Sequence, residues 1–306
     1  MGIDFQPLTL KHKSTVEKYM FPFGEGSCQH SFTGMFYTND KYAHAVCETE
    51  GALLVRREKL GDERFRVYLM PMGQGDIAPA LKKLRADARA HSALIKLETV
   101  TEKAKDMMEA RFPGMFITEE ARDYAEYLYF TDKLAELPGS SLSGKRRDVN
   151  HFWRRYEGRI RIKDMAAEDA GEVRAFQSAW LKEREGREDF CHLLREDAAV
   201  ARGLENFNAL GLRGILLYVD GALRGFAYGA QISNDTFDIM AEKGDTRIKD
   251  IYRVLNMENV RRCCAGLRYV NYEEDIGLPG LRKLKLSYKP DILMKKYIMK
   301  EAAGVE

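Results

Sequence analysis

The sequence predicts an α/β protein built from two halves of similar organisation. Hydrophobic residues make up 45% of the 306 residues and charged residues 31%, the composition of a globular chain that can bury a core. The length suits two domains of ordinary size. Segments with strand-like and helix-like periodicity alternate along both halves, which is typical of this class. We therefore expect mixed sheets flanked by helices, in domains covering 1–157 and 158–306.

In the first half, helices are expected where apolar residues recur about every 3.6 residues, and strands where short apolar runs lie between turn residues. The expected helices are 15–20, 76–91 and 101–111, and the expected strands are 42–50, 52–56, 65–71, 93–98 and 115–118. Thr101 is the expected N-cap of its helix, because a threonine hydroxyl can accept a hydrogen bond from a first-turn N–H group.

The second half repeats this order of elements. The expected helices are 166–182, 189–210 and 250–267, and the expected strands are 214–219, 223–232, 236–242 and 269–273. Asp220-Gly221 between two apolar runs predicts the turn of a β-hairpin. The repetition concerns the order of elements only, since no sequence repeat accompanies it.

The junction of the halves is marked by the turn-rich stretch 138–144. A helical pattern follows over 145–156, with Val149, Phe152 and Tyr156 on one face. Because ligand clefts often form where domains meet, we expect a binding site near this helix.

Positive charge is concentrated in two places, although the net charge is only +2. Residues 145–163 hold eight Lys/Arg against two acids, and residues 281–300 hold seven against one. Such clustering favours a site for an anionic ligand over a general polyanion coat. Lys145 and Arg146 begin the junction helix, and Asn150 lies one turn later on the same face. A solvated basic helix is the alternative.

The terminal cluster follows a run of alternating polar residues. Asn271, Glu273 and Asp275 would share one face of a strand. A glycine- and proline-containing turn follows, and a returning segment then carries the lysines Lys283, Lys285 and Lys289. The arrangement predicts paired acidic and basic groups, with an ordinary salt-bridged edge as the alternative.

Several classes of protein are disfavoured. The five cysteines include no Cys-x-x-Cys pair and are expected to be thiols in a reducing compartment, with no metal site. The N-terminus lacks the pattern of a secretion signal, and no apolar run approaches the roughly 20 residues of a membrane span. The sequence therefore favours a soluble, cytoplasmic protein.

Three segments together resemble one known family. The central Leu-x-Gly-Lys-Arg-Arg-x-x-Asn-x-Phe, the terminal Asn-x-Glu-x-Asp-Ile-Gly-x-x-Gly-Leu-Arg-x-x-Lys-x-x-Tyr-x-Pro and the segment 242–256 are similar to the soluble C-terminal domain of phosphatidylglycerol lysyltransferases. The resemblance covers the central and C-terminal parts, while residues 1–120 match mainly in the order of elements.

The resemblance implies a tandem pair of GNAT-like acyltransferase domains related to the Fem peptidyltransferases. Characterised members move an aminoacyl group from a charged tRNA to a lipid hydroxyl. Matching by motif implies catalytic roles for Glu273, Asp275 and Lys285. It implies substrate-binding roles for Lys145, Arg146, Asn150, Arg282 and Tyr288.

The chain departs from the family in two features. The long membrane-spanning N-terminal region usual in lipid-modifying members is not expected from this sequence. Its segment Gly244-Asp-Thr-Arg-Ile-Lys-Asp also lacks the Arg/Gln-x-x-Gly-x-Gly/Ala loop that binds the pyrophosphate of acetyl-CoA in other GNAT enzymes. Acyl-CoA is therefore the less favoured donor, and no resident cofactor is expected.

The expected reaction is transfer of an aminoacyl group from aminoacyl-tRNA to an unknown acceptor. Peripheral contact of the protein with a membrane is compatible with this reaction. Glu273 or Asp275 would accept a proton or hold the donor's amino group, and Lys285 or Arg146 would offset the charge of the tetrahedral intermediate. The alternatives are an acyl-CoA-dependent N-acyltransferase and a non-catalytic module that binds RNA or other anions.

Overall fold

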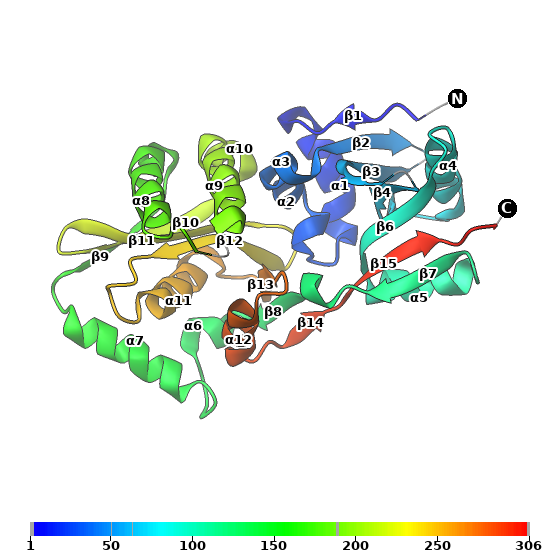
Figure 1. The fold of residues 1–306 in the computed structure, drawn as a ribbon. Coiled ribbons are helices and arrows are strands. Elements are labelled where there is room, and N and C mark those ends of the chain that lie inside the picture. Colours follow the sequence, from blue (N-terminus) through cyan, green and yellow to red (C-terminus); the bar gives the residue numbers. More distant parts are fainter. Residues whose placement is uncertain (1–2, 50, 63, 188–189, 305–306) are drawn as a thin grey trace. The chain divides into compact units, whose positions relative to one another are not determined.

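A computed structural model describes residues 3–49, 51–62, 64–187 and 190–304 (Figure 1). The chain divides into two compact units, neither of which is one continuous segment. The first unit comprises 1–127, 274–285 and 292–306, and the second comprises 128–273 and 286–291.

The sheet of the first unit has the strand order β1-β2-β3-β4-β6-β15-β7, with β5 paired to β3. Its strands are β1 Gln6–Pro7, β2 His44–Thr49, β3 Ala52–Gly61, β4 Phe65–Leu69, β5 Met72–Gly73, β6 Leu94–Thr101, β7 Phe116–Glu120 and β15 Lys296–Glu301. Its helices are α1 Lys13–Phe23, α2 Phe32–Tyr37, α3 Asn39–Tyr42, α4 Ala78–Arg89 and α5 Glu102–Arg111. β4 and β6 run parallel and the other pairings given for this sheet are antiparallel, so the sheet is mixed.

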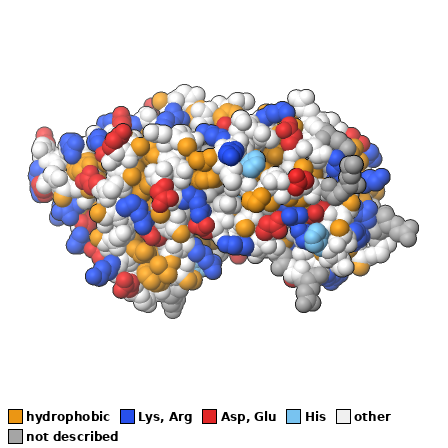
Figure 2. All heavy atoms as spheres, turned by 90° about the horizontal axis from the view of Figure 1, so that it is seen from above, with side chains coloured by type: hydrophobic (Ala, Val, Ile, Leu, Met, Phe, Trp, Pro, Cys, Tyr) orange, Lys and Arg blue, Asp and Glu red, His pale blue; other side chains and the backbone are white. Residues whose placement is uncertain are grey.

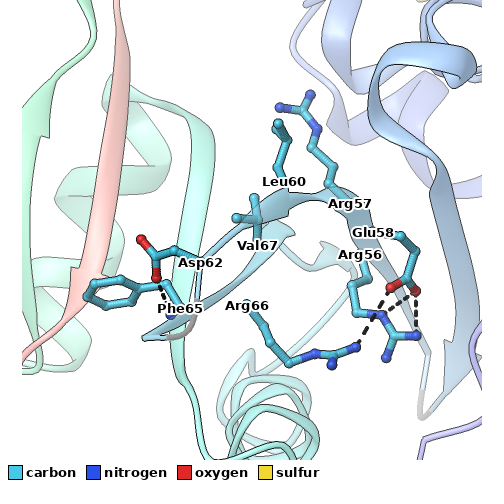
Figure 3. A pocket seen from close by; sticks show the side chains of 8 residues that line it. All are labelled: Arg56, Arg57, Glu58, Leu60, Asp62, Phe65, Arg66 and Val67. Atoms are coloured by element: carbon cyan, nitrogen blue, oxygen red, sulfur yellow. Dashed lines mark hydrogen bonds and ion pairs between the residues drawn. The ribbon is translucent and has the colours of Figure 1, made fainter.

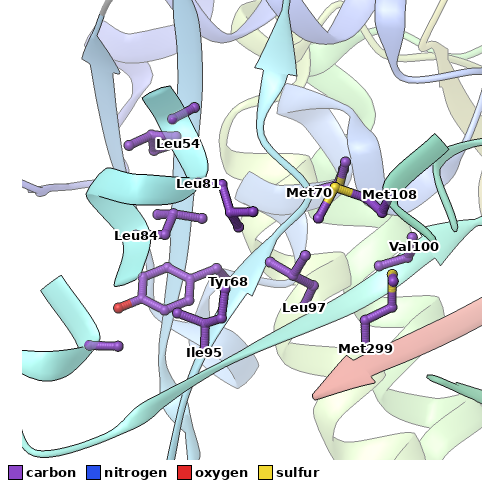
Figure 4. Close-up of a cluster of buried hydrophobic side chains, with 12 residues drawn as sticks. Leu54, Tyr68, Met70, Leu81, Leu84, Ile95, Leu97, Val100, Met108 and Met299 are labelled. Atoms are coloured by element: carbon purple, nitrogen blue, oxygen red, sulfur yellow. The ribbon is translucent and has the colours of Figure 1, made fainter. Parts of the chain in front are cut away.

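The hydrophobic core of the first unit lies between α4 and this sheet (Figure 4). Leu81 and Leu84 of α4 pack over Tyr68 of β4 and Leu97 of β6, and Met299 of β15 joins the same cluster. All five side chains are almost fully buried, and burial of each contributes about 1.5–3 kcal/mol. The last strand of the chain is therefore part of the first core.

The second sheet has the order β14-β8-β13-β12-β11-β10-β9. Its strands are β8 Glu126–Phe130, β9 Ile160–Asp164, β10 Arg213–Val219, β11 Ala222–Gln231, β12 Thr236–Gly244, β13 Tyr269–Glu274 and β14 Ile292–Met294. The helices of the second unit are α6 Thr131–Glu136, α7 Ser143–Arg155, α8 Ala170–Lys182, α9 Phe190–Glu205, α10 Phe207–Leu210 and α11 Ile251–Cys263. β12 and β13 are parallel, whereas β9 to β12 pair antiparallel, so this sheet is mixed as well.

Most expected elements are confirmed, with small shifts at their ends. Thr101 caps α5 by accepting a hydrogen bond from the Ala104 N–H group at 3.3 Å. Asp220 and Gly221 both have positive φ, as a two-residue hairpin turn requires. Two expected ends, at Glu50 and at Asp189, lie outside the described residues.

The secondary structure of the region after β13 was left open by the sequence patterns. The expected returning segment is a helix, α12 Pro279–Ser287. Proline suits the first turn of a helix, because its fixed φ is already helical and its missing N–H group would have no partner there. The pattern of leucine at 281, 284 and 286 is ambiguous between a strand and a helix. β15, which no periodicity had indicated, follows this region.

Two surface properties bear on function. On the face shown in Figure 2, Lys and Arg side chains are interspersed with Asp and Glu side chains, so this face carries no large field of one sign. Within the described ranges, no helix is both long and apolar enough to cross a membrane.

Candidate functional site

The second sheet separates where β12 meets β13. The two parallel strands pair from Thr236↔Tyr269 to Asp238↔Asn271. β12 then continues to Gly244, and β13 to Glu274, without further pairing between them. A β-bulge accompanies this separation, since Tyr228 and Gly229 of β11 pair with residues 241 and 239, which leaves one extra residue on β12. Side chains beyond the pairing can therefore approach from both strands.

Glu242 lies on the part of β12 that pairs with β11 but no longer with β13. Its side chain faces α11. Its neighbour Lys243 points to the other face, where its Nζ lies 2.5 Å from Glu196 of α9 and 4.7 Å from the ring centre of Trp180 of α8. Side chains alternate along a strand, so Glu242 and Gly244 share the opposite face. A Cβ at Gly244 would lie 2.8 Å from the Ile251 side chain, so α11 packs closely there.

Tyr272 of β13 and Asn256 of α11 complete a polar cluster with Glu242. The Tyr272 hydroxyl hydrogen-bonds the Glu242 carboxylate and also accepts a hydrogen bond from Asn256 Nδ2. The Tyr129 ring lies edge-on to both Tyr272 and Tyr288, at centroid distances of 5.7 and 6.5 Å. Aromatic rings thus lie on one side of Glu242, whose Oε2 is buried although the residue as a whole is partly exposed.

The electrostatics of this cluster favour the neutral form of Glu242. Burial raises the pKa of the Glu242 carboxyl to about 8, although Lys243 and the hydrogen bond from Tyr272 act in the opposite direction. Burial and the nearby Glu242 also raise the pKa of Tyr272 and Tyr288. Glu242 Oε2 has no hydrogen-bond partner among the described residues. A carboxyl group that titrates near neutral pH and has an available oxygen is suited to proton transfer.

Two residues expected from the sequence, Lys145 and Tyr288, meet beside this cluster. Lys145 Nζ donates to Ser287 Oγ at 2.7 Å and lies 3.9 Å from the ring centre of Tyr288. Burial and the neighbouring Arg253 lower the pKa of the Lys145 ammonium. Arg253 of α11 in turn pairs with Asp148 of α7 at 3.1 Å, which holds the basic helix against α11.

The other expected residues of the second unit have different surroundings. Arg146 Nη1 donates to the carbonyl oxygens of Leu137 and Gly139, so it orders the turn before α7. Asn150 is exposed. Glu273 has a left-handed backbone with φ of 56°, and its N–H group donates to Asn271 Oδ1 at 2.7 Å. The strand alternation expected through Asp275 therefore ends at Glu273.

Asp275 and Arg282 lie in the first unit, where Asp275 is the buried centre of a network with partly exposed arginines. Asp275 is fully buried and accepts hydrogen bonds from Arg122 at 3.1 Å, from Arg282 at 2.8 Å and from the Gly277 N–H group at 3.0 Å. Burial acts to raise its pKa, but the bonds from Arg282, Tyr127 and Gly277 hold the pKa of Asp275 well below its usual range. This geometry is that of a structural ion pair.

Lys285 also belongs to the first unit and is nearly buried. Its Nζ donates to the Glu274 carbonyl oxygen at 2.6 Å and lies 5.7 Å from the ring centre of Tyr127. The lysine therefore links α12 to the end of β13.

Comparison with known proteins identifies the family. Residues 22–300 match the family described as phosphatidylglycerol lysyltransferase, C-terminal. The chain belongs to this family.

Solved structures share the fold of this chain. A conserved protein of unknown function from Bacteroides thetaiotaomicron is 30% identical, with a TM-score of 0.91 over 98% of this chain and 100% of that one. L-PGS from Bacillus licheniformis is 15% identical, with a TM-score of 0.67 over 100% and 95%. FemX is 12% identical, with a TM-score of 0.61 over 98% of each chain. The expected tandem GNAT-like fold is confirmed by this likeness and by that to a tandem GNAT protein from the clavulanic acid biosynthesis pathway.

A curated relative matches only in part. An uncharacterised protein of Mycoplasmoides gallisepticum is 26% identical over 175 residues, which are 57% of this chain and 55% of that protein. The match thus spans about half the length of the relative.

Within this member of the phosphatidylglycerol lysyltransferase family, sequence reasoning missed three residues of the cluster: Glu242, Asn256 and Tyr272. One signal was present, because Glu242 directly follows the apolar residues 239–241 of β12, where a carboxylate is costly to bury. No local sequence pattern relates Glu242 to Tyr272, which lies 30 residues later in the chain.

A separate pocket in the first unit has the wrong character for a ligand site (Figure 3). It is lined by Arg56, Arg57, Glu58, Leu60, Asp62, Phe65, Arg66 and Val67. Each guanidinium already contacts a carboxylate: Arg56 lies 3.0 Å from Asp87, Arg66 lies 3.5 Å from Asp87, and Arg57 lies 3.1 Å from Glu98. In the part of the chain that the structure describes, no group of three or more His, Cys, Asp or Glu side chains could hold a metal ion.

Proposed function

We propose that this protein transfers an aminoacyl group from aminoacyl-tRNA to an acceptor that carries a hydroxyl or amino group. Membership of the family supports aminoacyl chemistry. The observation that carries the proposal is the Glu242 carboxyl, with its raised pKa and its available Oε2, at the separation of β12 and β13. A charged-tRNA donor implies that the reaction takes place in the cytoplasm.

The proposed reaction needs one proton acceptor and no resident cofactor. The acceptor's oxygen or nitrogen attacks the ester carbonyl carbon while Glu242 Oε2 takes the proton that it loses. The tetrahedral intermediate then collapses, the carbonyl–ribose bond breaks, and the protonated Glu242 returns the proton to the ribose oxygen. A new ester or amide and an uncharged tRNA result. The ester is already activated, so orientation and proton transfer supply most of the catalysis.

Lys145 and Tyr288 are the proposed contacts to the donor. The Lys145 ammonium lies beside the Glu242 cluster at the start of a basic helix, where it can bind a phosphate close to the reacting ester. Asp275 and Arg282 are proposed to anchor the turn after β13, and Lys285 to hold α12 to that strand.

The loop between β12 and α11 argues against CoA as the donor. Asp245 accepts hydrogen bonds from the N–H group of Arg247 at 3.1 Å and from its guanidinium at 2.8 Å. Its carboxylate thus occupies the turn before a helix N-terminus, where a pyrophosphate would otherwise bind. We expect no thermal stabilisation by CoA, whereas a CoA-dependent enzyme would be stabilised by an amount that grows with the logarithm of the ligand concentration over its Kd.

The experiment is product formation from a labelled pool of charged tRNA. The full chain is incubated with this pool and, in separate arms, phosphatidylglycerol vesicles or a small-molecule cell extract. Glu242→Gln is expected to lower the rate about 10²- to 10⁴-fold, because it removes the proton acceptor at constant shape. Glu258→Gln is the matched control, since Glu258 is a nearly buried acid of α11 that pairs with Arg261. Equal rates for Glu242→Gln and the wild type would contradict the proposal.

A further inference from the structure

Asn259 of α11 is buried without a partner. Its side chain is fully inaccessible, and neither Oδ1 nor Nδ2 has a hydrogen-bond partner among the described residues. Leaving a buried polar group unpaired costs about 1–3 kcal/mol, so such a group in a folded protein requires an explanation. Both halves of the amide, one donor and one acceptor, are available.

The direction in which the Asn259 side chain points from α11 follows from the contacts of its neighbours. Leu255 packs against β11 and β12, because its Cδ1 would lie 2.7 Å from a Cβ at Gly225 and 3.3 Å from one at Gly244. Asn256 contacts Tyr272 of β13. Successive residues of a helix are rotated by about 100° around its axis, so the Asn259 side chain points between the directions of Leu255 and Asn256. Asn259 therefore faces the separation between β12 and β13.

The position of Asn259 along the β12–β13 separation follows from the direction of α11. α11 connects two parallel neighbouring strands, so it runs back along them in the opposite direction. One turn beyond Asn256, Asn259 lies nearer the last pairing, Asp238↔Asn271, and Glu242 lies nearer the open end. Asn256 Oδ1 is also without a partner in the described part of the chain. Side-chain polar atoms without a hydrogen-bond partner among the described residues are thus found along the separation, from Glu242 Oε2 near its open end to Asn259 near the last strand pairing.

We propose that Asn259 recognises the α-amino acyl unit of the donor. Its Nδ2 donates to the ester carbonyl oxygen, and its Oδ1 accepts from the α-ammonium, with Asn256 Oδ1 as a second acceptor. An α-amino ester carries such an acceptor and such a donor on adjacent carbons, whereas a plain acyl group offers only the acceptor. This inference rests on the proposed function and adds the feature that separates aminoacyl donors from other esters.

A site built to hydrogen-bond a substrate group rejects analogues that lack it, in favourable cases by about 10⁴-fold. The wild type is therefore expected to prefer charged tRNA over the same tRNA after acetylation of the α-amino group. It should also be stabilised thermally by alanine ethyl ester more than by ethyl propionate, which has the same acyl skeleton without the amine.

The decisive variant is Asn259→Leu, which keeps the shape and removes both polar atoms. Because the amide is unpaired, this change should leave the folded protein as stable or more stable. Gln177→Leu is the matched control, since Gln177 of α8 is also fully buried and both of its side-chain polar atoms lack a partner among the described residues. Asn259→Leu should lower the preference for the unacetylated donor at least about tenfold and abolish the difference between the two small esters. Gln177→Leu should change neither.

The outcomes separate the two proposals. Consumption of charged tRNA with the same donor preference in the wild type and in Asn259→Leu would overturn the role of Asn259 and leave the proposed function standing. Absence of any consumption would overturn the proposed function, and the small-ester measurement would then decide the inference alone. Equal stabilisation of the wild type by both esters, as expected if buried water alone satisfies Asn259, would overturn it.

Discussion

Glu242 shows how one residue acquires its chemistry from its surroundings. A glutamate on an exposed strand would titrate well below neutral pH, but here burial raises the pKa to about 8. The same shift affects folding. Between the usual glutamate pKa and about 8, the folded protein holds a proton that the unfolded chain has released. Stability contributed by this group therefore falls as pH rises through that window.

The corresponding prediction concerns the pH dependence of unfolding. The Tm of the wild type should fall from pH 5 to pH 9 relative to the Tm of Glu242→Gln, because glutamine has no proton to lose. Thermal denaturation of both proteins across this range measures the difference. Parallel curves would show that Glu242 titrates at its ordinary pKa.

Asp275 provides a second test at the scale of single residues. Asp275→Asn is expected to destabilise the protein by about 1.5–3 kcal/mol, since it removes the buried anion to which Arg122 and Arg282 donate charged hydrogen bonds. Urea denaturation measures the loss, with Asp76→Asn, an exposed ion pair, as control. Unchanged stability combined with lost activity would return Asp275 to the catalytic role that the sequence suggested.

Single residues were only partly predictable. Lys145 and Tyr288 were expected as site residues because their segments match motifs of the family, and the structure brings the two side chains together. Glu242, Asn256 and Tyr272 were missed because their proximity depends on where two strands stop pairing. No periodicity within one segment carries that information.

At the scale of elements, the separation of β12 from β13 depends on close packing at Gly229 of β11. A Cβ there would lie 1.8 Å from the Asp238 carbonyl oxygen, next to the last pairing of β12 with β13. Gly229→Ala must therefore displace backbone.

We expect Gly229→Ala to cost about 1–3 kcal/mol and to lower turnover, because β12 carries Glu242. Gly144→Ala is the control. It lies on α7 with nothing within 4 Å of an added Cβ, and alanine there should stabilise the helix by up to about 1 kcal/mol. Chemical denaturation and rate measurements on both variants test the prediction. A Gly229→Ala protein as stable and active as the control would show that the separation tolerates movement.

Elements with strong local patterns were predicted well, and those defined by pairing were not. The amphipathic pattern of α7 and the turn residues of the β10–β11 hairpin are properties of the segments themselves. β15 is short and alternates weakly, and it becomes a strand because β6 and β7 flank it. Tertiary context decides such segments.

At the scale of the whole molecule, the return of the chain end to the first unit is fixed by a buried ion pair. Lys296 of β15 lies 2.7 Å from Glu126 and donates to Ser27 Oγ at 2.6 Å, and both charged side chains are fully buried. The sequence could not reveal this ion pair, since Lys296 and Glu126 are 170 residues apart in the chain. The fold class itself was accessible, through composition, alternation and the family resemblance.

Lys296→Met is expected to cost about 3–5 kcal/mol, because it leaves the Glu126 charge buried without its cation. Lys295→Met should cost no more than about 1 kcal/mol, since Lys295 forms an exposed pair with Glu102. Denaturation of both variants provides the measurement. Similar small losses would mean that β15 contributes little to the first unit.

The most direct test of the central claim is the pH dependence of aminoacyl transfer. Rates with labelled charged tRNA are measured from pH 6 to pH 9.5 for the wild type and Glu242→Gln, after subtraction of spontaneous ester hydrolysis. The wild-type rate is expected to rise with a midpoint near pH 8, and the Glu242→Gln rate to be at least about 10²-fold lower and independent of this ionisation. Superimposable profiles would contradict this expectation.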